Sequence, residues 1–267
     1  MNIQNLFPSL FPNGIVAWQL AALIFAGLCI GISKTGINGV TTIMIPVLAL
    51  IFGAKESTGI VLPMLCFADL LAVIYYRRNA EWKHIFRLLP WAIAGFGIAI
   101  LVDRLIPAKG FKFLIGICIL IGLVVMLWND RRGKDVKIPS AWWFSAIFGT
   151  MGGFATMIGN AAGPIMSVFL LSMRLPKTSF VGTAAWFFMA VNYLKIPLQV
   201  FVWNNITRES LLFDLTMIPV IIIGAVLGII LVKKVSEKHY KTLVYCMTLI
   251  SAILLFLDLQ KILGVTG

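Results

Sequence analysis

The stretch Gly31-Ile-Ser-Lys-Thr-Gly-Ile-Asn-Gly39 decides the fold, because it interrupts two apolar runs with glycines and polar side chains. A second stretch of the same kind, Gly152-Gly-Phe-Ala-Thr-Met-Ile-Gly-Asn-Ala-Ala-Gly163, interrupts the apolar runs of the other half. Backbone of this kind persists at membrane depth only where protein covers it or where it lines a water-filled cavity. If the flanking runs span a membrane, both stretches indicate interrupted helices around a buried site.

The composition indicates that these runs do span a membrane. Of the 267 residues, 60% are hydrophobic and 12% are charged, and the mean hydropathy is +0.99. A soluble domain carries charge on ~25% of its residues, and a spanning helix needs ~20 largely apolar residues. The chain is therefore predicted to be an all-α integral membrane protein, with apolar segments near 15–33, 39–53, 57–76, 85–102, 111–128, 141–158, 160–173, 178–201, 210–232 and 241–258.

The two halves of the chain are related by an internal duplication. A constant offset places Gly31 on Gly153 and Asn38 on Asn160, and the apolar segments after both interruptions are too short to cross a bilayer comfortably. With an odd number of crossings per half, the second copy must be inserted upside down. We therefore expect two inverted-topology repeats, each with one short broken or re-entrant helix. The expected order is 1–14 N-terminal segment, 15–128 first repeat, 129–140 basic linker, 141–258 second repeat and 259–267 C-terminal tail.

The positive charges follow the pattern of cytoplasmic loops. The chain has 22 Lys and Arg against 10 Asp and Glu, and the cations gather between apolar segments, as at Arg77, Arg78, Lys83 and Arg87. This positive-inside bias predicts a multi-pass protein of the bacterial cytoplasmic membrane with both termini outside. It also argues against a nucleic-acid partner. Residues 1–14 contain no Lys or Arg, which argues against a cleaved signal peptide.

Metal-ligating and nucleophilic residue types are scattered along the sequence. The 4 cysteines stand singly inside apolar runs, and both histidines, His84 and His239, lie among charged residues. We find no metal-ligand spacing, nucleophile–base pair or nucleotide-binding loop in the sequence. Neither a metal site nor a cofactor nor an enzyme activity is therefore expected.

Helix starts and glycines at the two interruptions can form an anion site. Asn38 and Asn160 precede the short helices in positions suited to N-caps, and a helix start presents unpaired N–H groups and about half a positive charge. Two such starts facing each other would hold an anion by backbone donors. Glycines also allow close approach of the backbone, although small residues equally serve tight helix packing; those concerned are Gly36, Gly39, Gly159 and Gly163.

Charged residues near or inside apolar segments are further candidates for this site. Lys195 needs a partner within its span, which a substrate anion would provide; the alternative is that it snorkels from a helix broken at Pro197. Lys34 is either a site cation or an ordinary inside-loop charge. Asp69 is a candidate for proton coupling, or else a structural partner of one of these lysines. The neighbouring aromatic residues either line the anion path or serve packing: Trp186, Phe187 and Phe188.

Each half of the chain also carries a recognisable signature. The first comprises Ser33-Lys-Thr-Gly-Ile-Asn-Gly39 and Glu56-Ser-Thr-Gly-Ile-Val-Leu-Pro63, and the second Thr156-Met-Ile-Gly-Asn-Ala-Ala-Gly-Pro164 and Asn192-Tyr-Leu-Lys-Ile-Pro197. Together they resemble the signatures of the sulfite exporter TauE/SafE family, and the resemblance extends over residues 17–257. It implies transport of a sulfur-containing anion such as sulfite, a sulfonate or sulfoacetate. The predicted substrate-binding residues are Lys34, Thr35, Gly36, Asn38, Gly39, Thr156, Gly159, Asn160, Gly163, Asn192 and Lys195.

Two functions fit these features. The first is a secondary transporter that moves the anion by alternating access, which inverted repeats and interrupted helices favour. In such a carrier, coupling to protons would run through Asp69. The second is an anion channel that uses the same loops as a selectivity filter. In the carrier, energy would come from an ion gradient, from the substrate's own gradient or from a separate subunit.

Overall fold

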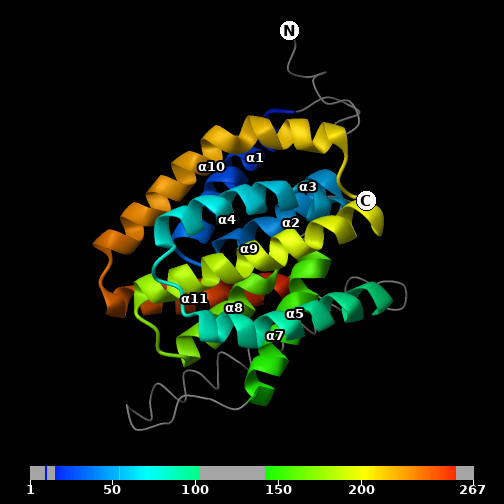
Figure 1. The fold of residues 1–267 in the computed structure, drawn as a ribbon. Coiled ribbons are helices and arrows are strands. Elements are labelled where there is room, and N and C mark those ends of the chain that lie inside the picture. Colours follow the sequence, from blue (N-terminus) through cyan, green and yellow to red (C-terminus); the bar gives the residue numbers. More distant parts are fainter. Residues whose placement is uncertain (1–9, 11–15, 54, 103–141, 257–267) are drawn as a thin grey trace.

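A computed structural model describes residue 10 and residues 16–53, 55–102 and 142–256. Every regular element in this part of the chain is a helix, and Figure 1 shows their arrangement. In chain order they are α1 (Ala17–Thr35), α2 (Val40–Phe52), α3 (Glu56–Ile60), α4 (Leu62–Tyr76), α5 (Trp82–Val102), α7 (Trp142–Gly159), α8 (Ala162–Ser172), α9 (Lys177–Phe201), α10 (Arg208–Lys234) and α11 (Glu237–Phe256). The expected segment 111–128 and linker 129–140 lie outside the described residues.

Within the described part, four helical stretches are long and apolar enough to cross a membrane: Ala17–Thr35, Glu56–Tyr76, Trp82–Val102 and Arg208–Lys234. Several large apolar side chains on the helices are exposed, including Leu101 at 73% and Leu215 at 59%. Apolar surface of this extent needs a lipid environment, because water would penalise its exposure. The predicted all-helical membrane class is therefore confirmed.

Both predicted interruptions are present, and each separates a long helix from a short one. Helix α1 ends at Thr35 and α2 begins at Val40, while α7 ends at Gly159 and α8 begins at Ala162. Helices α2 and α8 contain 13 and 11 residues. At 1.5 Å per residue they measure ~20 Å and ~16 Å, well short of a ~30 Å hydrocarbon core. Their ends must therefore lie inside the protein.

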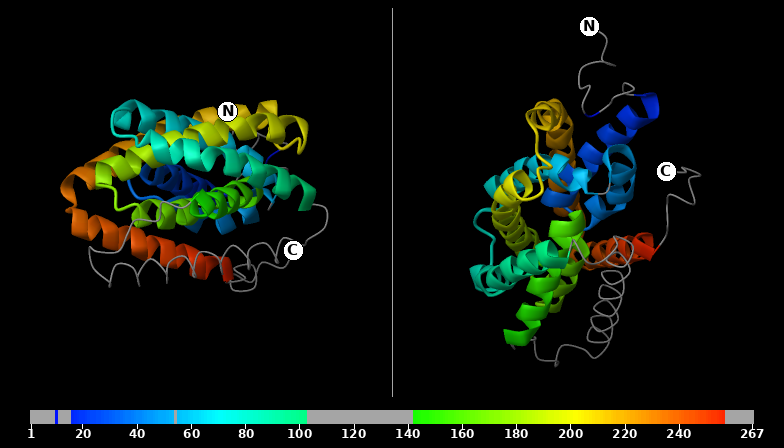
Figure 2. Two further views of the ribbon diagram at one scale, coloured as in Figure 1. Left: turned by 60° about the horizontal axis from the view of Figure 1, so that its bottom comes forward. Right: turned by 90° about the vertical axis from the view of Figure 1, so that its right-hand side faces the viewer.

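The long helices pair closely through glycines. Helix α1 packs along α10, α5 packs along α7, and α4 packs against α9. In Figure 1 and in the right-hand view of Figure 2, the α1–α10 pair and the α5–α7 pair lie on opposite sides of the bundle. A Cβ atom on Gly31 would overlap the backbone of α10 at Ile221, and one on Gly153 would overlap the backbone of α5 at Ala92. Glycine therefore sets both contact distances.

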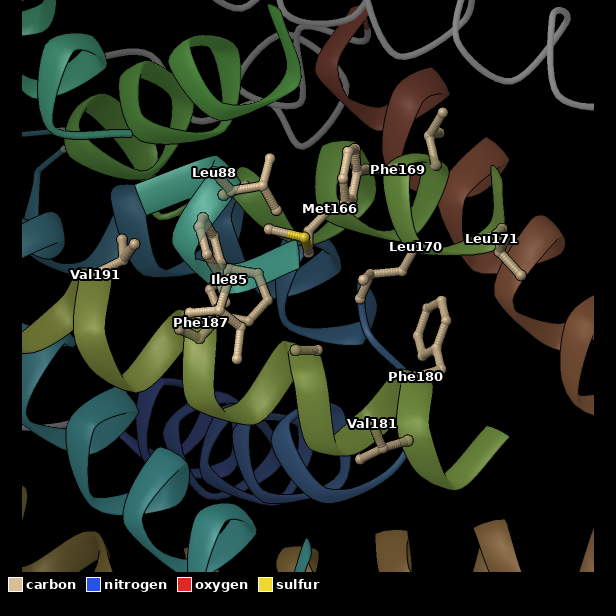
Figure 3. Close-up of a cluster of buried hydrophobic side chains, with 14 of the residues drawn as sticks. Ile85, Leu88, Met166, Phe169, Leu170, Leu171, Phe180, Val181, Phe187 and Val191 are labelled. Atoms are coloured by element: carbon tan, nitrogen blue, oxygen red, sulfur yellow. The ribbon is translucent and has the colours of Figure 1, made fainter. Parts of the chain in front are cut away.

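A hydrophobic cluster holds the short helix α8 in place. Phe169 and Leu170 of α8 pack in it together with Phe180 and Phe187 of α9 and Leu88 of α5 (Figure 3). Each of these five side chains is at most 1% exposed. Because such a core is closely packed, it fixes the position of α8 and of the interruption that precedes it.

Helix α9 departs from one alternative drawn from the sequence. The chain does not break at Pro197, because α9 runs from Lys177 to Phe201 with this proline inside it. The proline lacks the backbone N–H that another residue would donate at this position. Lys195, six residues before the end of the helix, is 0% exposed, so its ammonium group does not snorkel to an interface.

The glycine contacts lead to a stability prediction. We expect Gly153→Ala to lower the free energy of unfolding by about 1–3 kcal/mol, because the new methyl group forces α5 and α7 apart. Gly97→Ala is the matched control, since Gly97 lies in α5 with no atom within 4 Å of the added Cβ. It should leave stability unchanged or raise it slightly through helix propensity. Thermal unfolding in detergent compares the two; equal melting temperatures would contradict the packing argument.

Candidate functional site

The two interruptions line one small cavity in the interior of the bundle. From the first half it is lined by Ser33, Lys34, Asn38, Gly39, Thr41 and Leu65, and from the second by Thr156, Asn160, Gly163, Phe188 and Asn192. Its volume is about 20 Å³. That is room for about one water molecule. The structure thus brings together two segments that are more than a hundred residues apart in sequence, with helix ends and polar side chains facing a common space.

Lys34 is the charged residue on the cavity wall, and it is paired with Asp69. Its Nζ lies 2.8 Å from Asp69 Oδ1, with 8% of the lysine and none of the aspartate exposed. Asn192 Nδ2 donates a 2.6 Å hydrogen bond to the other carboxylate oxygen, Oδ2. The Phe188 ring lies beneath the ammonium group, 4.3 Å from Nζ to the ring centroid. Helices α1, α4 and α9 therefore meet at one buried ion pair.

Lys195 stands directly behind the cavity wall and is held by uncharged acceptors. Its Nζ donates to the carbonyl oxygen of Thr156 at 2.9 Å, to Thr156 Oγ1 at 3.1 Å and to Asn160 Oδ1 at 2.6 Å. Asn160 Nδ2 in turn donates to the carbonyl oxygen of Thr58. Lys195 thus fixes the interruption between α7 and α8 from behind, while Thr156 and Asn160 face the cavity.

Two further polar side chains on the cavity wall have unused hydrogen-bonding capacity. Asn38 is 2% exposed and Thr41 is 7% exposed. Among the described residues, neither Asn38 Nδ2 nor Thr41 Oγ1 has a hydrogen-bond partner. A buried donor without a partner costs about 1–3 kcal/mol, so such groups call for an explanation. A bound anion would satisfy both groups as donors.

The structure sorts the sequence-predicted site residues into three groups. Seven line the cavity: Lys34, Asn38, Gly39, Thr156, Asn160, Gly163 and Asn192. Asp69 and Lys195 lie behind the wall and bind residues that form it. Three others are away from the lining: Thr35 Oγ1 donates to the carbonyl oxygen of Ala225, Gly36 packs against Gly228 of α10, and Gly159 has open space around it. Gly36 thus makes a close helix contact of the kind that the packing interpretation describes.

The predicted N-cap roles of Asn38 and Asn160 are wrong. The cap positions are Gly39 and Ala161, and neither short helix receives a side-chain cap. Asn160 has a φ of 53° and Gly39 a φ of 100°. Asparagine and glycine tolerate this left-handed backbone, which turns the chain sharply between helices. The Asn160 side chain binds Lys195 and Thr58, and Asn38 lines the cavity.

Sequence reasoning missed two polar residues. Thr41 lines the cavity from the first turn of α2, and its position directly after the interruption was the available signal. Asp214 is 5% exposed within α10, and neither of its carboxylate oxygens has a hydrogen-bond partner among the described residues. An acid in the apolar context Leu211-Leu-Phe-Asp-Leu215 was the signal here. It lies outside the cavity lining.

The chemistry of the site is that of binding. Its wall offers an ammonium group, amide and hydroxyl groups and an aromatic ring. Among the residues that the structure describes, no group of three or more His, Cys, Asp or Glu side chains could hold a metal ion. The wall is therefore suited to a small anion that accepts several hydrogen bonds.

Comparison with known proteins gave one match. Residues 23–255 match the family described as sulfite exporter TauE/SafE. This range includes both interruptions, the ion pair and Lys195. No curated protein and no solved structure matches the chain.

The Lys34–Asp69 pair yields a stability prediction. Removing one partner leaves the other buried and unpaired, so Lys34→Gln and Asp69→Asn should each destabilise the fold by about 3–5 kcal/mol. The double variant Lys34→Gln/Asp69→Asn should recover most of this loss, because no uncompensated charge remains. Melting temperatures of the four proteins complete the cycle. If the two single effects simply add in the double variant, the pair makes no energetic contribution as a pair.

Proposed function

The chain belongs to the sulfite exporter TauE/SafE family, and on this premise we propose that it carries a small sulfur-containing anion through the cavity by alternating access. As a member it is a multi-pass membrane transporter of sulfur anions and not an enzyme. Beyond family membership, the proposal specifies three things: the cavity as the anion-binding site, a movement of the two halves of the chain against each other, and coupling to protons. The sulfite, sulfonate and sulfoacetate classes are the substrates to be compared.

One observation carries the proposed site: unused donors and a buried lysine converge where two interrupted helices meet. Lys34 Nζ, Asn38 Nδ2 and Thr41 Oγ1 all belong to cavity-lining residues. A sulfonate or sulfite group has three oxygen acceptors and negative charge, which these groups match. The cavity holds only about 20 Å³, so a polyatomic anion needs it to widen. Binding is therefore proposed to accompany a movement of the surrounding helices.

The packing of the long helices supports two inverted repeats. Helix α1 corresponds to α7 by the sequence offset, and α5 corresponds to α10. Helix α1 packs along α10, and its counterpart α7 packs along α5. A two-fold relation between the halves would place α7 on α1 and α5 on α10, so it would convert the α1–α10 contact into the α7–α5 contact. In our proposal the two halves rock against each other about the cavity, both termini lie outside, and the bilayer is the cytoplasmic membrane.

 The closed cavity favours a carrier over a channel. Nine of its eleven lining residues are buried, and Asn160 and Gly163 are half-buried. An anion channel requires a continuous open path in its conducting state. A carrier instead passes through states in which the site is closed to both sides, and the described arrangement resembles such a state.

Asp69 is proposed as the proton-coupling group, because it competes with the substrate for Lys34. With the cavity closed, Lys34 is paired with Asp69 at 2.8 Å. An anion that binds Lys34 draws the ammonium group away from the carboxylate, which then takes up a proton. Anion and proton therefore favour each other's binding through linkage.

Lys195 is proposed to support the site from behind. Its three acceptors are uncharged, so its positive charge is not neutralised by any of them. The charge therefore contributes a favourable potential at the cavity, which Thr156 and Asn160 separate from the ammonium group. Direct contact with the anion is proposed for Lys34, whereas Lys195 acts on the anion through Thr156 and Asn160.

The proposed site is tested by anion binding and by flux into proteoliposomes. Lys34→Gln/Asp69→Asn should weaken binding of sulfite, an alkanesulfonate and sulfoacetate by about tenfold to a hundredfold, because a hydrogen bond to a charged group contributes ~1.5–3 kcal/mol. Lys195→Gln should weaken it less. Lys83→Gln, at an exposed position in α5, is the control and should bind as wild type does.

Counterflow distinguishes the two modes of transport in the same liposomes. Unlabelled anion inside should accelerate uptake of labelled anion by a carrier, whereas a channel gives no such stimulation. Wild-type affinity in Lys34→Gln/Asp69→Asn would refute the proposed site, and flux without counterflow would refute alternating access while leaving the site intact.

The proton linkage predicts a pH dependence. Anion affinity of the wild type should rise as pH falls from about 8 to 5, by at most about tenfold per pH unit for one proton. The sign follows because protonation of Asp69 frees Lys34 for the anion. Asp69→Asn should flatten this dependence. Asp214→Asn removes another buried carboxylate outside the cavity lining and should retain the wild-type profile. An unchanged profile in Asp69→Asn would remove Asp69 from the coupling mechanism.

A further inference from the structure

A large groove lies between α4 and α10, away from the transport cavity. Its volume is about 540 Å³, which is within the range of ligand-binding pockets. The walls are apolar: Leu71 and Ile74 from α4, and Ile222, Val226 and Ile229 from α10. On α10 the three side chains recur at spacings of four and three residues, so they form a stripe along one helix face. The groove therefore runs along the helices for about two turns.

One end of the groove is basic. Arg77, Arg78 and Asn79 follow the end of α4 and line this end, and all three are exposed. Lys233, at the end of α10, places its Nζ 5.4 Å from the ring centroid of Tyr75. Tyr75 itself lines the groove. Apolar walls thus lead to a cluster of positive charge where the two helices end.

We propose that this groove binds an anionic phospholipid, with its phosphate at Arg77 and Arg78 and an acyl chain along the apolar stripe. Charge and shape together select this occupant. A soluble anion would leave the apolar walls uncovered, and a lipid without net charge would leave the positive charges of Arg77 and Arg78 unpaired. Basic residues at the end of a transmembrane helix are a recurrent site for acidic lipid headgroups. The end that carries them is also the one that the positive-inside pattern assigns to the cytoplasm.

The groove is connected to the transport site by two hydrogen bonds. Ala225 lines the groove, and its carbonyl oxygen accepts a 2.7 Å bond from Thr35 Oγ1. Tyr76, between two groove residues, donates from its hydroxyl to the carbonyl oxygen of Thr35 at 3.0 Å. Thr35 adjoins Lys34 in sequence. A lipid that bridges α4 and α10 would therefore stabilise the end of α1 that carries the site lysine.

Lipid binding to the purified full-length protein tests the proposal. Native mass spectrometry would follow titration of the delipidated protein with phosphatidylglycerol and with phosphatidylcholine. Arg77→Gln/Arg78→Gln should weaken phosphatidylglycerol binding by about fivefold per arginine and leave phosphatidylcholine binding nearly unchanged. Lys83→Gln/Arg87→Gln removes the same charge from exposed positions of α5 and should behave as wild type.

A second variant separates the groove from general surface attraction. Val226→Trp fills the apolar stripe at a position that is 49% exposed, and it leaves both arginines in place. It should also weaken phosphatidylglycerol binding by about fivefold or more. Equal binding by Val226→Trp and wild type would overturn the proposal, as would equal losses in the two double variants. Displacement of the lipid by millimolar glycerol phosphate would identify a free-anion site in its place.

Discussion

A charged ammonium group inside a membrane protein needs partners, and the architecture around Lys34 and Lys195 provides them in two different ways. Lys34 meets a carboxylate from α4, whereas Lys195 meets only neutral oxygens from the interruption between α7 and α8. Each set of partners comes from the same half of the chain as its lysine, and the two halves are joined at these groups where Asn192 binds Asp69 and Asn160 binds Thr58. The packing of these helices therefore depends on the same charged residues that form the site, since the helices cannot separate without leaving an ammonium group unpaired.

Close helix packing makes this arrangement possible. Gly31 and Gly153 occupy corresponding places in α1 and α7, and each lets the backbone of a helix from the opposite half approach. These contacts leave the interruptions facing each other rather than facing lipid. The short helix α8 is then braced by aromatic residues such as Phe169 and Phe187, which hold the polar turn rigidly. Stability and function thus depend on the same helix contacts.

The Lys34–Asp69 pair is also the feature through which the site can respond to an arriving anion. A buried ion pair adds little net stability compared with apolar packing, but it offers an arriving anion an ammonium group already in position. Asn192 holds the carboxylate on its other side, so the carboxylate is not left unsupported when the lysine moves. Lipid in the α4–α10 groove would act on α4, which carries Asp69, and would in this way link the membrane composition to the site.

The sequence by itself determined the helical class, the two interruptions and the candidate charges, because apolar run length and glycine-rich breaks are local properties of the chain. Helix bounds agree closely with the predicted segments wherever residues are described; α9, for example, spans Lys177–Phe201 against an expected 178–201. Only the tertiary structure decided that Lys34 faces the cavity while Lys195 lies behind it, and that Asp69 pairs with Lys34. It also decided that Asn160 binds Lys195 in place of capping α8. These outcomes depend on how each helix is rotated and how far it is shifted against its neighbours, and contacts between distant segments set both.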